Sequence, residues 1–429
     1  MANVVFRNIT VVDPQSDHHL QQADVWIKSG IIHAIAKASQ LTISTDIQEV
    51  NIEGACLSPG WLDMHVHLSD PGYEWKENLN ALSKAAITGG FTDILCYPNT
   101  VPVVDHSQMI HSLLGRAIDE AVSLHFCGTL TQAAAGKELA ELYDMHSAGA
   151  IAFTDGTHHL QHTGLILRAL QYMQVFEGLM IHYPSDNRLV GNGQMNEGIA
   201  STRLGMPGIP ELAEASATAK DLQILAYAGG RMHLQPMSAP TSLSMIKAAK
   251  QQNPGLSVGT DIAYLCMDDE QLETFDSNYK LFPPLRSVSQ QAQLQQALQS
   301  GLIDSIASGH WAQTAEEKQM EFSQAEAGIL GLQTAFSLVN MHLIEKNVID
   351  LSRFVELIAI NPRKILKIPA LRIAEGEKAS LTCFHPSVEW TFNHKHIFSR
   401  SRNSPCMNQL LKGKVLGIYH KELLHLATD

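Results

Sequence analysis

The stretch FTDILCYPN (residues 91–99) is a short, mostly apolar run that stops at a Pro-Asn turn signal. A run of this length and composition is typical of a strand buried on both faces of a parallel sheet. The same kind of run recurs along the chain: VSLHFCGTL (122–130), AIAFTDG (150–156), LMIHYP (179–184), RMHLQPMS (231–238), LSVGTDIAYL (256–265) and IDSIASGH (303–310). We therefore expect a sheet with many parallel strands.

Segments of helical periodicity separate these runs, such as HSQMIHSLLGRAIDEA (106–121) and IPELAEASATAKDLQILAYAG (209–229). Seven or eight β–α units between residues 56 and 368 predict an α/β fold, a (β/α)8 TIM-type barrel, with a doubly wound sheet as the alternative. Residues 1–55 and 369–429 have the pattern of short strands and turns. We expect these two ends to pair into one small composite β-domain, a β-sandwich.

Bulk composition restricts the class of protein. The chain has 429 residues, a net charge of −13 and no run of Lys or Arg, so a nucleic-acid-binding surface is not expected. The sequence contains no apolar run of about 18 residues and no signal-peptide pattern, which predicts a cytoplasmic protein without a membrane span. Six scattered cysteines are expected to be reduced and mostly buried: Cys56, Cys96, Cys127, Cys266, Cys383 and Cys406.

Two histidines lie one residue apart in PGWLDMHVHLSDPG (59–72), at His65 and His67. Residues i and i+2 of a strand point to the same face, so both imidazoles can reach one metal ion. In a (β/α)8 barrel the chemistry lies at the carboxyl ends of the strands. The polar residues that end the apolar runs are therefore candidate site residues.

The chain resembles the dihydroorotases of the amidohydrolase superfamily along nearly its full length. The matching pieces, in the family's order, are PGWLDMHVHL, DPGYEWKENL, AAITGGFTDILCYPNTVPVVD, RLGMPGIPELAEA, FDSNYKLFPPLR, EEKQMEFSQAEAGILGLQTAF and NPRKILKI. The resemblance implies a metal-dependent (β/α)8 barrel with a composite β-domain from both termini. It also implies a hydrolase reaction of pyrimidine biosynthesis, the reversible cyclisation of N-carbamoyl-L-aspartate to dihydroorotate.

The family reaction uses a metal-bound hydroxide and an Asp that accepts and returns a proton. The resemblance implies four metal-ligand candidates, of which the third is at the bridging position: His65, His67, Asp155 and His182. It implies two substrate-binding candidates: Asn99, in the PNT motif, and Asn278.

The catalytic part of the family pattern is interrupted at two strand ends. In HLQPMS, Pro236 occupies the position of a ligand histidine, and His233, three residues earlier, points to the opposite face of a strand. In SGHWAQ, Gly309 replaces the Asp that is both metal ligand and general base, while the neighbouring His310 alternates away from the ligand face. No catalytic residue therefore remains at the position of the base.

Two substrate contacts of the family are also absent. Ser69 in HLSDPG replaces the Arg that binds the substrate carboxylate, and a neutral hydroxyl cannot replace a bidentate guanidinium. Gln313 replaces the substrate-binding histidine. Loss of a positioned base alone typically costs about 10²–10⁴ in rate, so the combined losses predict activity at background.

Several candidates have a structural alternative. The remaining ligands predict one zinc ion at most, and the alternative is a pocket without metal in which the histidines bond to one another. Asp155 either binds metal or caps the following turn. Three histidines in THHLQHTG (157–164) are interpreted as part of a solvated segment: His158, His159 and His162. Asp261 and Asp268 are interpreted as ordinary loop carboxylates.

Two functional hypotheses follow. In the first, the chain is a catalytically silent dihydroorotase homologue kept for structure, because the missing groups lie in the chemistry while segments such as GGFTDILCYPNT are intact. The resemblance implies association with the catalytic subunit of aspartate transcarbamoylase, and we expect a homo-oligomer. In the second, an active dihydroorotase or related cyclic-amide hydrolase uses a mononuclear zinc site of His65, His67 and either Asp155 or His182.

Overall fold

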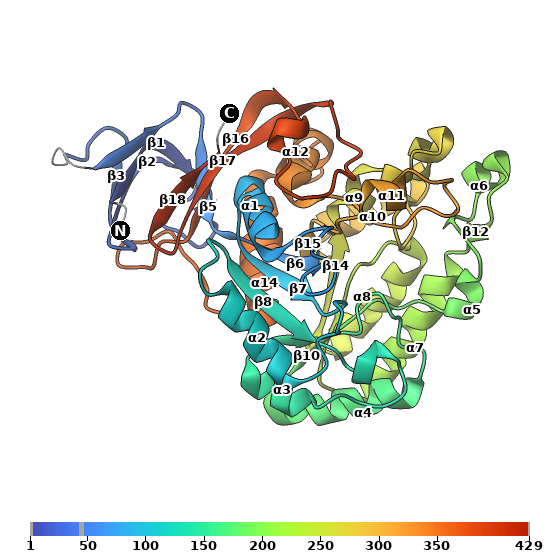
Figure 1. Cartoon of the computed structure of the whole chain (residues 1–429). Coiled ribbons are helices and arrows are strands. Elements are labelled where there is room, and N and C mark those ends of the chain that lie inside the picture. Colours follow the sequence, from blue (N-terminus) through green and yellow to red (C-terminus); the bar gives the residue numbers. More distant parts are fainter. Residues whose placement is uncertain (1–2, 43–46, 428–429) are drawn as a thin grey trace.

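Eight parallel strands form a barrel in the computed structural model, which describes residues 3–42 and 47–427 (Figure 1). In sequence order the strands are β6 (Trp61–His67), β7 (Phe91–Tyr97), β8 (Ser123–Gly128), β9 (Ala152–Phe153), β10 (Leu179–His182), β13 (Arg231–Leu234), β14 (Leu256–Asp261) and β15 (Ser305–Ala307). Each pairs with the next one in this order. The His67 N–H donates to the His310 carbonyl at 2.8 Å and joins the end of the last strand to the first. The predicted (β/α)8 barrel is confirmed.

The barrel strands are buried on both faces. All seven residues of β7 are buried, which explains why FTDILCY is almost continuously apolar. This strand pairs in parallel with β6 on one side and with β8 on the other. Because all eight strands run in the same direction, their carboxyl ends and the polar residues that follow them meet at one end of the barrel.

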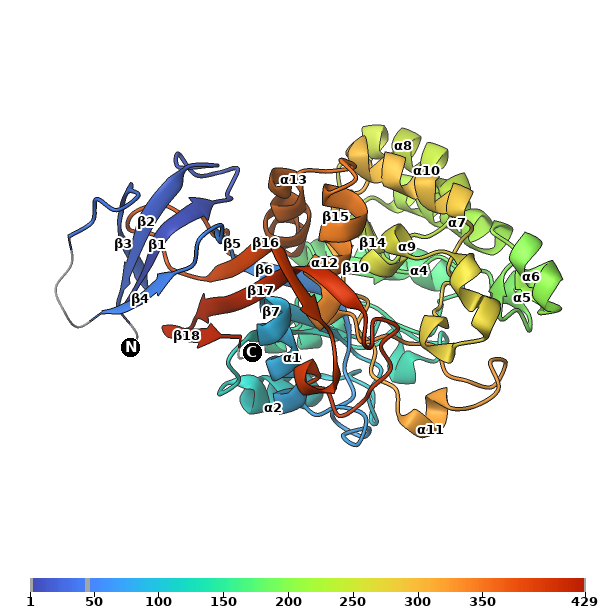
Figure 2. The ribbon, with the colours of Figure 1, turned by 90° about the horizontal axis from the view of Figure 1, so that it is seen from above.

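Helices cover the outside of the barrel (Figure 2). Those between β6 and β15 are α1 (Leu79–Gly89), α2 (Ser107–Ala117), α3 (Leu142–Ala148), α4 (Thr163–Met173), α7 (Leu212–Ala228), α8 (Leu243–Gln252), α9 (Ile262–Cys266) and α10 (Val288–Gln299). The last ones are α11 (Ala315–Lys318), α12 (Ala335–Val339), α13 (Leu351–Val355) and α14 (Asn361–Leu366). Between β10 and α7 a segment projects outward with α5 (Asn187–Val190), β11 (Met195–Asn196), α6 (Ile199–Leu204) and β12 (Gly208–Ile209).

Strands from both ends of the chain form a second sheet, in the order β18, β17, β16, β5, β1, β2, β3, with β4 paired to β1. Their bounds are β1 (Val4–Val11), β2 (Gln22–Lys28), β3 (Ile31–Lys37), β4 (Gln48–Asn51), β5 (Cys56–Pro59), β16 (Leu381–Thr391), β17 (Leu410–His420) and β18 (Leu423–Leu426). The core of this unit combines residues of both ends, among them Phe6 and Tyr419. The predicted composite β-domain is confirmed, and β5, just beyond residue 55, belongs to its sheet.

The side chain of Trp61 connects the barrel to the β-domain. Trp61 is fully buried at the start of β6. The centroid of its ring system lies 5.1 Å from that of Phe354 and 5.5 Å from that of Phe384, which belongs to β16. Each such aromatic pair adds about 0.5–1.5 kcal/mol beyond the area it buries. The two parts of the chain therefore share one apolar contact zone.

The cysteines behave as expected. All six are buried and free, which confirms the prediction of buried thiols without disulfides. Burial raises the pKa of the Cys56 thiol to about 11, so this group stays protonated and unreactive at neutral pH. Among residues 3–42 and 47–427, no helix is both long enough and apolar enough to cross a bilayer.

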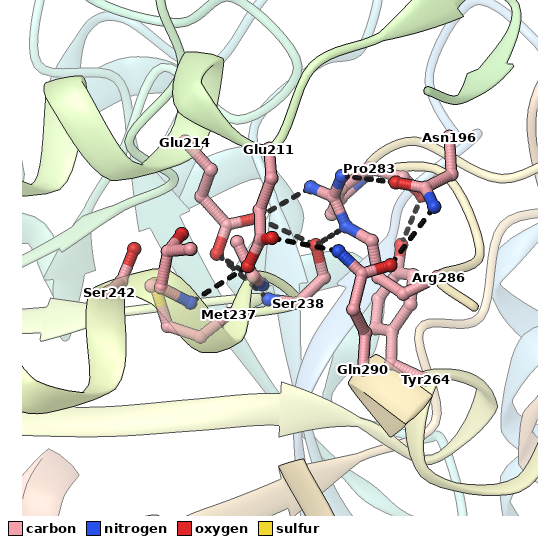
Figure 3. A network of polar contacts seen from close by, with 12 residues as sticks. Asn196, Glu211, Glu214, Met237, Ser238, Ser242, Tyr264, Pro283, Arg286 and Gln290 are labelled. Atoms are coloured by element: carbon pink, nitrogen blue, oxygen red, sulfur yellow. Dashed lines mark hydrogen bonds and ion pairs between the residues drawn. The ribbon is translucent and has the colours of Figure 1, made fainter. Parts of the chain in front are cut away.

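A buried ion pair connects two of the segments that resemble the family, RLGMPGIPELAEA and FDSNYKLFPPLR (Figure 3). The Glu214 carboxylate accepts from the backbone N–H groups of Ser238 and Ala239 at 3.0 and 2.8 Å and from the Arg286 guanidinium at 3.2 Å. Arg286 also donates to the Asn196 side chain at 3.0 Å. These residues tie α7, the loop after β13 and the projecting segment to one another, so their role in the fold is structural.

Replacement of Glu214 tests this role. We expect Glu214→Gln to lower the free energy of unfolding by about 3–5 kcal/mol, because the Arg286 guanidinium stays buried without its counter-charge. The matched control is Glu273→Gln, which breaks the Arg203–Glu273 pair, whose side chains are 54% and 50% exposed. Exposed pairs of this kind contribute about 0–1 kcal/mol. Urea unfolding of both variants measures the difference, and equal effects would contradict the structural role.

Candidate functional site

A cavity of about 280 Å³ opens at the carboxyl ends of the barrel strands. Its wall combines imidazole, phenol and indole rings with a few neutral polar groups: His65, His67, Tyr97, Thr154, Gly156, Thr157, His159, Tyr183, Gln235, Pro236, Phe282 and Trp311. Two of the four predicted metal ligands, His65 and His67, are in this wall. The cavity is therefore the counterpart of the site that the sequence predicts.

The two histidines of β6 are side by side but have different partners. Their ring centroids are 5.0 Å apart, as the i, i+2 spacing on a strand requires. The Nδ1 atom of His65 lies 2.9 and 3.0 Å from the two carboxylate oxygens of Asp261. Burial opposes the charged imidazole, but the Asp261 carboxylate raises the pKa of His65 above its ordinary value. Burial lowers the pKa of His67, which is therefore neutral.

The Asp155 carboxylate is turned toward its own loop. One of its oxygens accepts from the backbone N–H groups of Leu130 and Thr131 at 2.9 Å each. The other accepts from the Thr131 hydroxyl at 2.6 Å. Burial raises the pKa of Asp155, and the Thr131 bonds oppose that shift. This geometry corresponds to the structural alternative for Asp155, in which it holds a turn together.

His182, at the end of β10, faces a helix and is absent from the cavity wall. Its Nδ1 atom lies 3.5 Å from a carboxylate oxygen of Asp221, in α7. Burial lowers the pKa of His182 to about 3 and raises the pKa of Asp221 to about 7. Burial thus favours the neutral form of both side chains.

The predicted ligands do not fit the predicted zinc site. Across the described ranges 3–42 and 47–427, no group of three or more His, Cys, Asp or Glu side chains is arranged so that it could hold a metal ion. Asp155 and His182 are engaged with other elements, and the Nδ1 atom of His65 is bonded to Asp261. No catalytic step through zinc is therefore derived for this arrangement.

The substrate-binding candidates also serve the local fold. The side chain of Asn99 donates to the Asp155 carbonyl at 2.9 Å and accepts from the Thr157 N–H at 3.2 Å, so it holds the loop after β9. The backbone N–H of Asn278 donates to Asp276 at 2.9 Å, and Asn278 is not among the residues of the cavity wall. Neither residue is placed by these contacts to bind a substrate inside the cavity.

The family positions that differ in this chain have acquired structural contacts. Ser69 is buried, and its carbonyl accepts from the Tyr73 N–H at 2.8 Å. The Gln313 side chain accepts from Lys76 at 2.8 Å and donates to the Ala327 carbonyl at 2.7 Å. Both residues hold loops around the barrel mouth.

The interpretation of Asp261 as an ordinary loop carboxylate is wrong. Asp261 is the last residue of β14, is buried, and reaches His65 on β6. Its carboxylate also accepts from the Gln235 side chain at 2.7 Å. The residue therefore contributes to the site, whereas Asp268, the other acid considered, caps a short helix by accepting from the Glu270 N–H.

The interpretation of His159 as part of a solvated segment is also wrong. Its ring lies in the cavity wall, stacked on Phe282 at a centroid distance of 5.1 Å. Burial lowers the pKa of His159 to about 3. His158 and His162 are exposed, as expected, and His162 accepts from the Leu165 N–H at the start of α4.

Trp311 is a site residue that the sequence analysis did not single out. Its ring stacks on His67 with a centroid distance of 4.1 Å and an interplanar angle of 17°. The ring covers His67 on the cavity side and occupies space near the strand ends. The available signal was its position in SGHWAQ, two residues after Gly309 at the end of an apolar run.

Removal of the Asp155 carboxylate tests its structural role. We expect Asp155→Ala to lower the free energy of unfolding by about 3 kcal/mol, because two backbone N–H groups and a hydroxyl lose a buried acceptor. The control Asp268→Ala, which removes a turn cap, should cost about 1 kcal/mol. Denaturation in the presence and absence of EDTA checks the cause. A chelator that destabilises the unmodified protein as strongly as Asp155→Ala would instead indicate metal ligation.

Comparisons with known proteins agree with the sequence resemblance. The family described as "Dihydro-orotase-like" matches residues 54–241. A dihydroorotase of Syntrophus aciditrophicus (strain SB) is 35% identical over 414 residues, which cover 96% of this chain and 96% of the relative. A dihydroorotase of Geobacter metallireducens is 34% identical over 412 residues, again 96% of each chain.

Solved structures support the same fold. An L-hydantoinase (dihydropyrimidinase) from Arthrobacter aurescens matches with a TM-score of 0.83 and 20% identity, covering 100% of this chain and 98% of that one. A dihydropyrimidinase from Brevibacillus agri matches with a TM-score of 0.80 and 20% identity, covering 99% and 95%. At this identity the similarity concerns the fold alone, a barrel with a β-sandwich domain. The identity to the curated relatives over almost the whole length shows that the chain belongs to the dihydroorotase family.

Proposed function

We propose that the chain is a catalytically defective dihydroorotase homologue that acts as a structural partner of aspartate transcarbamoylase. One observation carries the first half of this proposal: the wall of the strand-end cavity contains no lysine and no arginine among the described residues. Both dihydroorotate and N-carbamoyl-L-aspartate carry carboxylates. Burial of a carboxylate without a cation or a dense set of donors is strongly unfavourable.

The surroundings of the cavity support the same conclusion. Ser69 and Gln313, which stand where the resemblance expects cationic or imidazole contacts to substrate, are engaged in loop contacts. Trp311 occupies space against His67. Asn99 is held by the loop after β9. Each of these contacts favours a stable barrel mouth over a substrate site.

The second half of the proposal rests on what the chain has kept. The Arg286–Glu214 pair and the Trp61 cluster hold distant segments together, and both include segments that resemble the family. A protein maintained as a folded body needs these contacts even when its chemistry is lost. Aspartate transcarbamoylase as the partner, and a homo-oligomeric state, are taken from the resemblance.

An active dihydroorotase or a related cyclic-amide hydrolase with a reduced zinc site is the second candidate. The position of Asp261 favours it, because a carboxylate at a hydrogen-bond distance from His65 is a group that could accept and return a proton. The absence of a cation in the described cavity wall opposes this candidate.

An assay of dihydroorotate hydrolysis separates the two candidates. We expect the purified protein with added zinc to show no more turnover than its His65→Ala variant, since the substrate clamp is missing. The control is His111→Ala, at an exposed histidine of α2. Turnover that His65→Ala abolishes and His111→Ala leaves intact would reject the silent-homologue proposal in favour of the enzyme.

Mixing experiments test the partnership. The purified chain and the aspartate transcarbamoylase catalytic subunit of the same organism should elute together in size-exclusion chromatography, with a mass by light scattering that fixes the stoichiometry. The mass of the chain alone checks the expected homo-oligomer. Separate elution of the two proteins at micromolar concentration would refute the structural-partner proposal.

A further inference from the structure

A hydrogen-bonded chain of five side chains crosses the strand-end site. Ser257 contacts Nδ1 of His233 at 2.8 Å, and Nε2 of His233 lies 3.3 Å from the Gln235 side-chain oxygen. The Gln235 amide donates to Asp261 at 2.7 Å, and Asp261 contacts Nδ1 of His65 at 2.9 Å. The chain connects β14 and β13 to β6, although β15 separates β14 from β6 in the barrel.

Asp261 can reach across β15 only because residue 309 is glycine. Gly309 has a φ of +65°, and a Cβ atom built on it would lie 2.7 Å from an Asp261 carboxylate oxygen and 2.9 Å from the carboxyl carbon. Contacts under about 3 Å between a Cβ and such atoms require something to move. A side chain at position 309 and the present Asp261 conformation therefore exclude each other.

Gly259 has the same relation to Gln235. A Cβ atom on Gly259 would lie 1.7 Å from the Gln235 side-chain oxygen and 2.8 Å from Nε2 of His233. These two side chains are buried next to the barrel strands, and each bonds to the next member of the chain. Two glycines thus supply the volume that the polar chain occupies.

The chain also satisfies the polar groups that it buries. Asp261 is buried but accepts from Gln235 and contacts His65. His233 has a partner on each ring nitrogen. Buried networks of this kind are stable only when every member is paired. The space left beside Gly309 is about 20 Å³, room for about one water molecule.

We propose that Asp261 has taken, from the adjacent strand, the volume of a side chain at position 309, and that the chain from Ser257 to His65 fills the strand-end site in place of a metal ion. The inference deepens the proposed loss of catalysis, on which it rests, by naming the groups that replaced the centre. It differs from a simple loss of ligands, because Asp261 and Gly309 form one compensating pair.

Zinc content of the unmodified protein gives the first test. After incubation with excess zinc and gel filtration, elemental analysis should find less than about 0.1 zinc per chain, whether or not His65 is replaced by alanine. One zinc per chain that His65→Ala removes would overturn the inference. Zinc binding without turnover would contradict this inference alone, and turnover without bound zinc would contradict the proposed function alone.

Thermal unfolding gives the second test. Gly309→Ala should lower Tm by about 3 °C or more beyond the effect of Gly205→Ala. Gly205 has a φ of +66° and open space around its Cβ position, so it matches the backbone strain without the contact. In an Asp261→Ala background the excess should vanish, because the overlapping carboxylate is gone. An excess that persists unchanged, or that is absent from the start, would refute the exclusion.

Discussion

The Asp261 carboxylate and any side chain at position 309 compete for one volume at the mouth of the barrel. A Cβ atom on Gly309 would come within 2.7 Å of that carboxylate, so the two cannot coexist in this conformation. The outcome determines the partner of His65, which is a protein carboxylate at 2.9 Å. It also determines how Gln235 and His233 are bonded, because both continue from Asp261 along the same chain of hydrogen bonds. The arrangement of the whole strand-end site depends on this contact.

The rest of the barrel has kept the contacts that hold its units together. Glu214 and Arg286 form a buried pair inside two family-like segments, and Asn99 supports the loop after β9. Such residues look functional in a sequence because they belong to distinctive motifs. Their contacts here are with the protein itself. Motifs of an enzyme family can therefore persist for the stability of the fold after the substrate contacts have changed.

The fold could be predicted from the sequence because local patterns determine it. The apolar runs that became β7 and β14 alternate with helices, and this pattern requires a parallel sheet. The neighbourhood of His65 and His67 followed from strand geometry. The role of Asp261 could not be predicted, because its contact with His65 joins residues 196 positions apart across an intervening strand. His159 was misjudged since polar neighbours suggested solvent, whereas Phe282 covers its ring.

A crystal structure of the protein grown with zinc, with anomalous data collected at the zinc edge, tests the central claim most directly. The account predicts no anomalous peak at the bonding distance of about 2.0–2.3 Å from His65 or His67, with Asp261 still bonded to Nδ1 of His65. A peak coordinated by His65, His67 and Asp261 would contradict it, because the carboxylate would then belong to a metal centre that the chain has rebuilt.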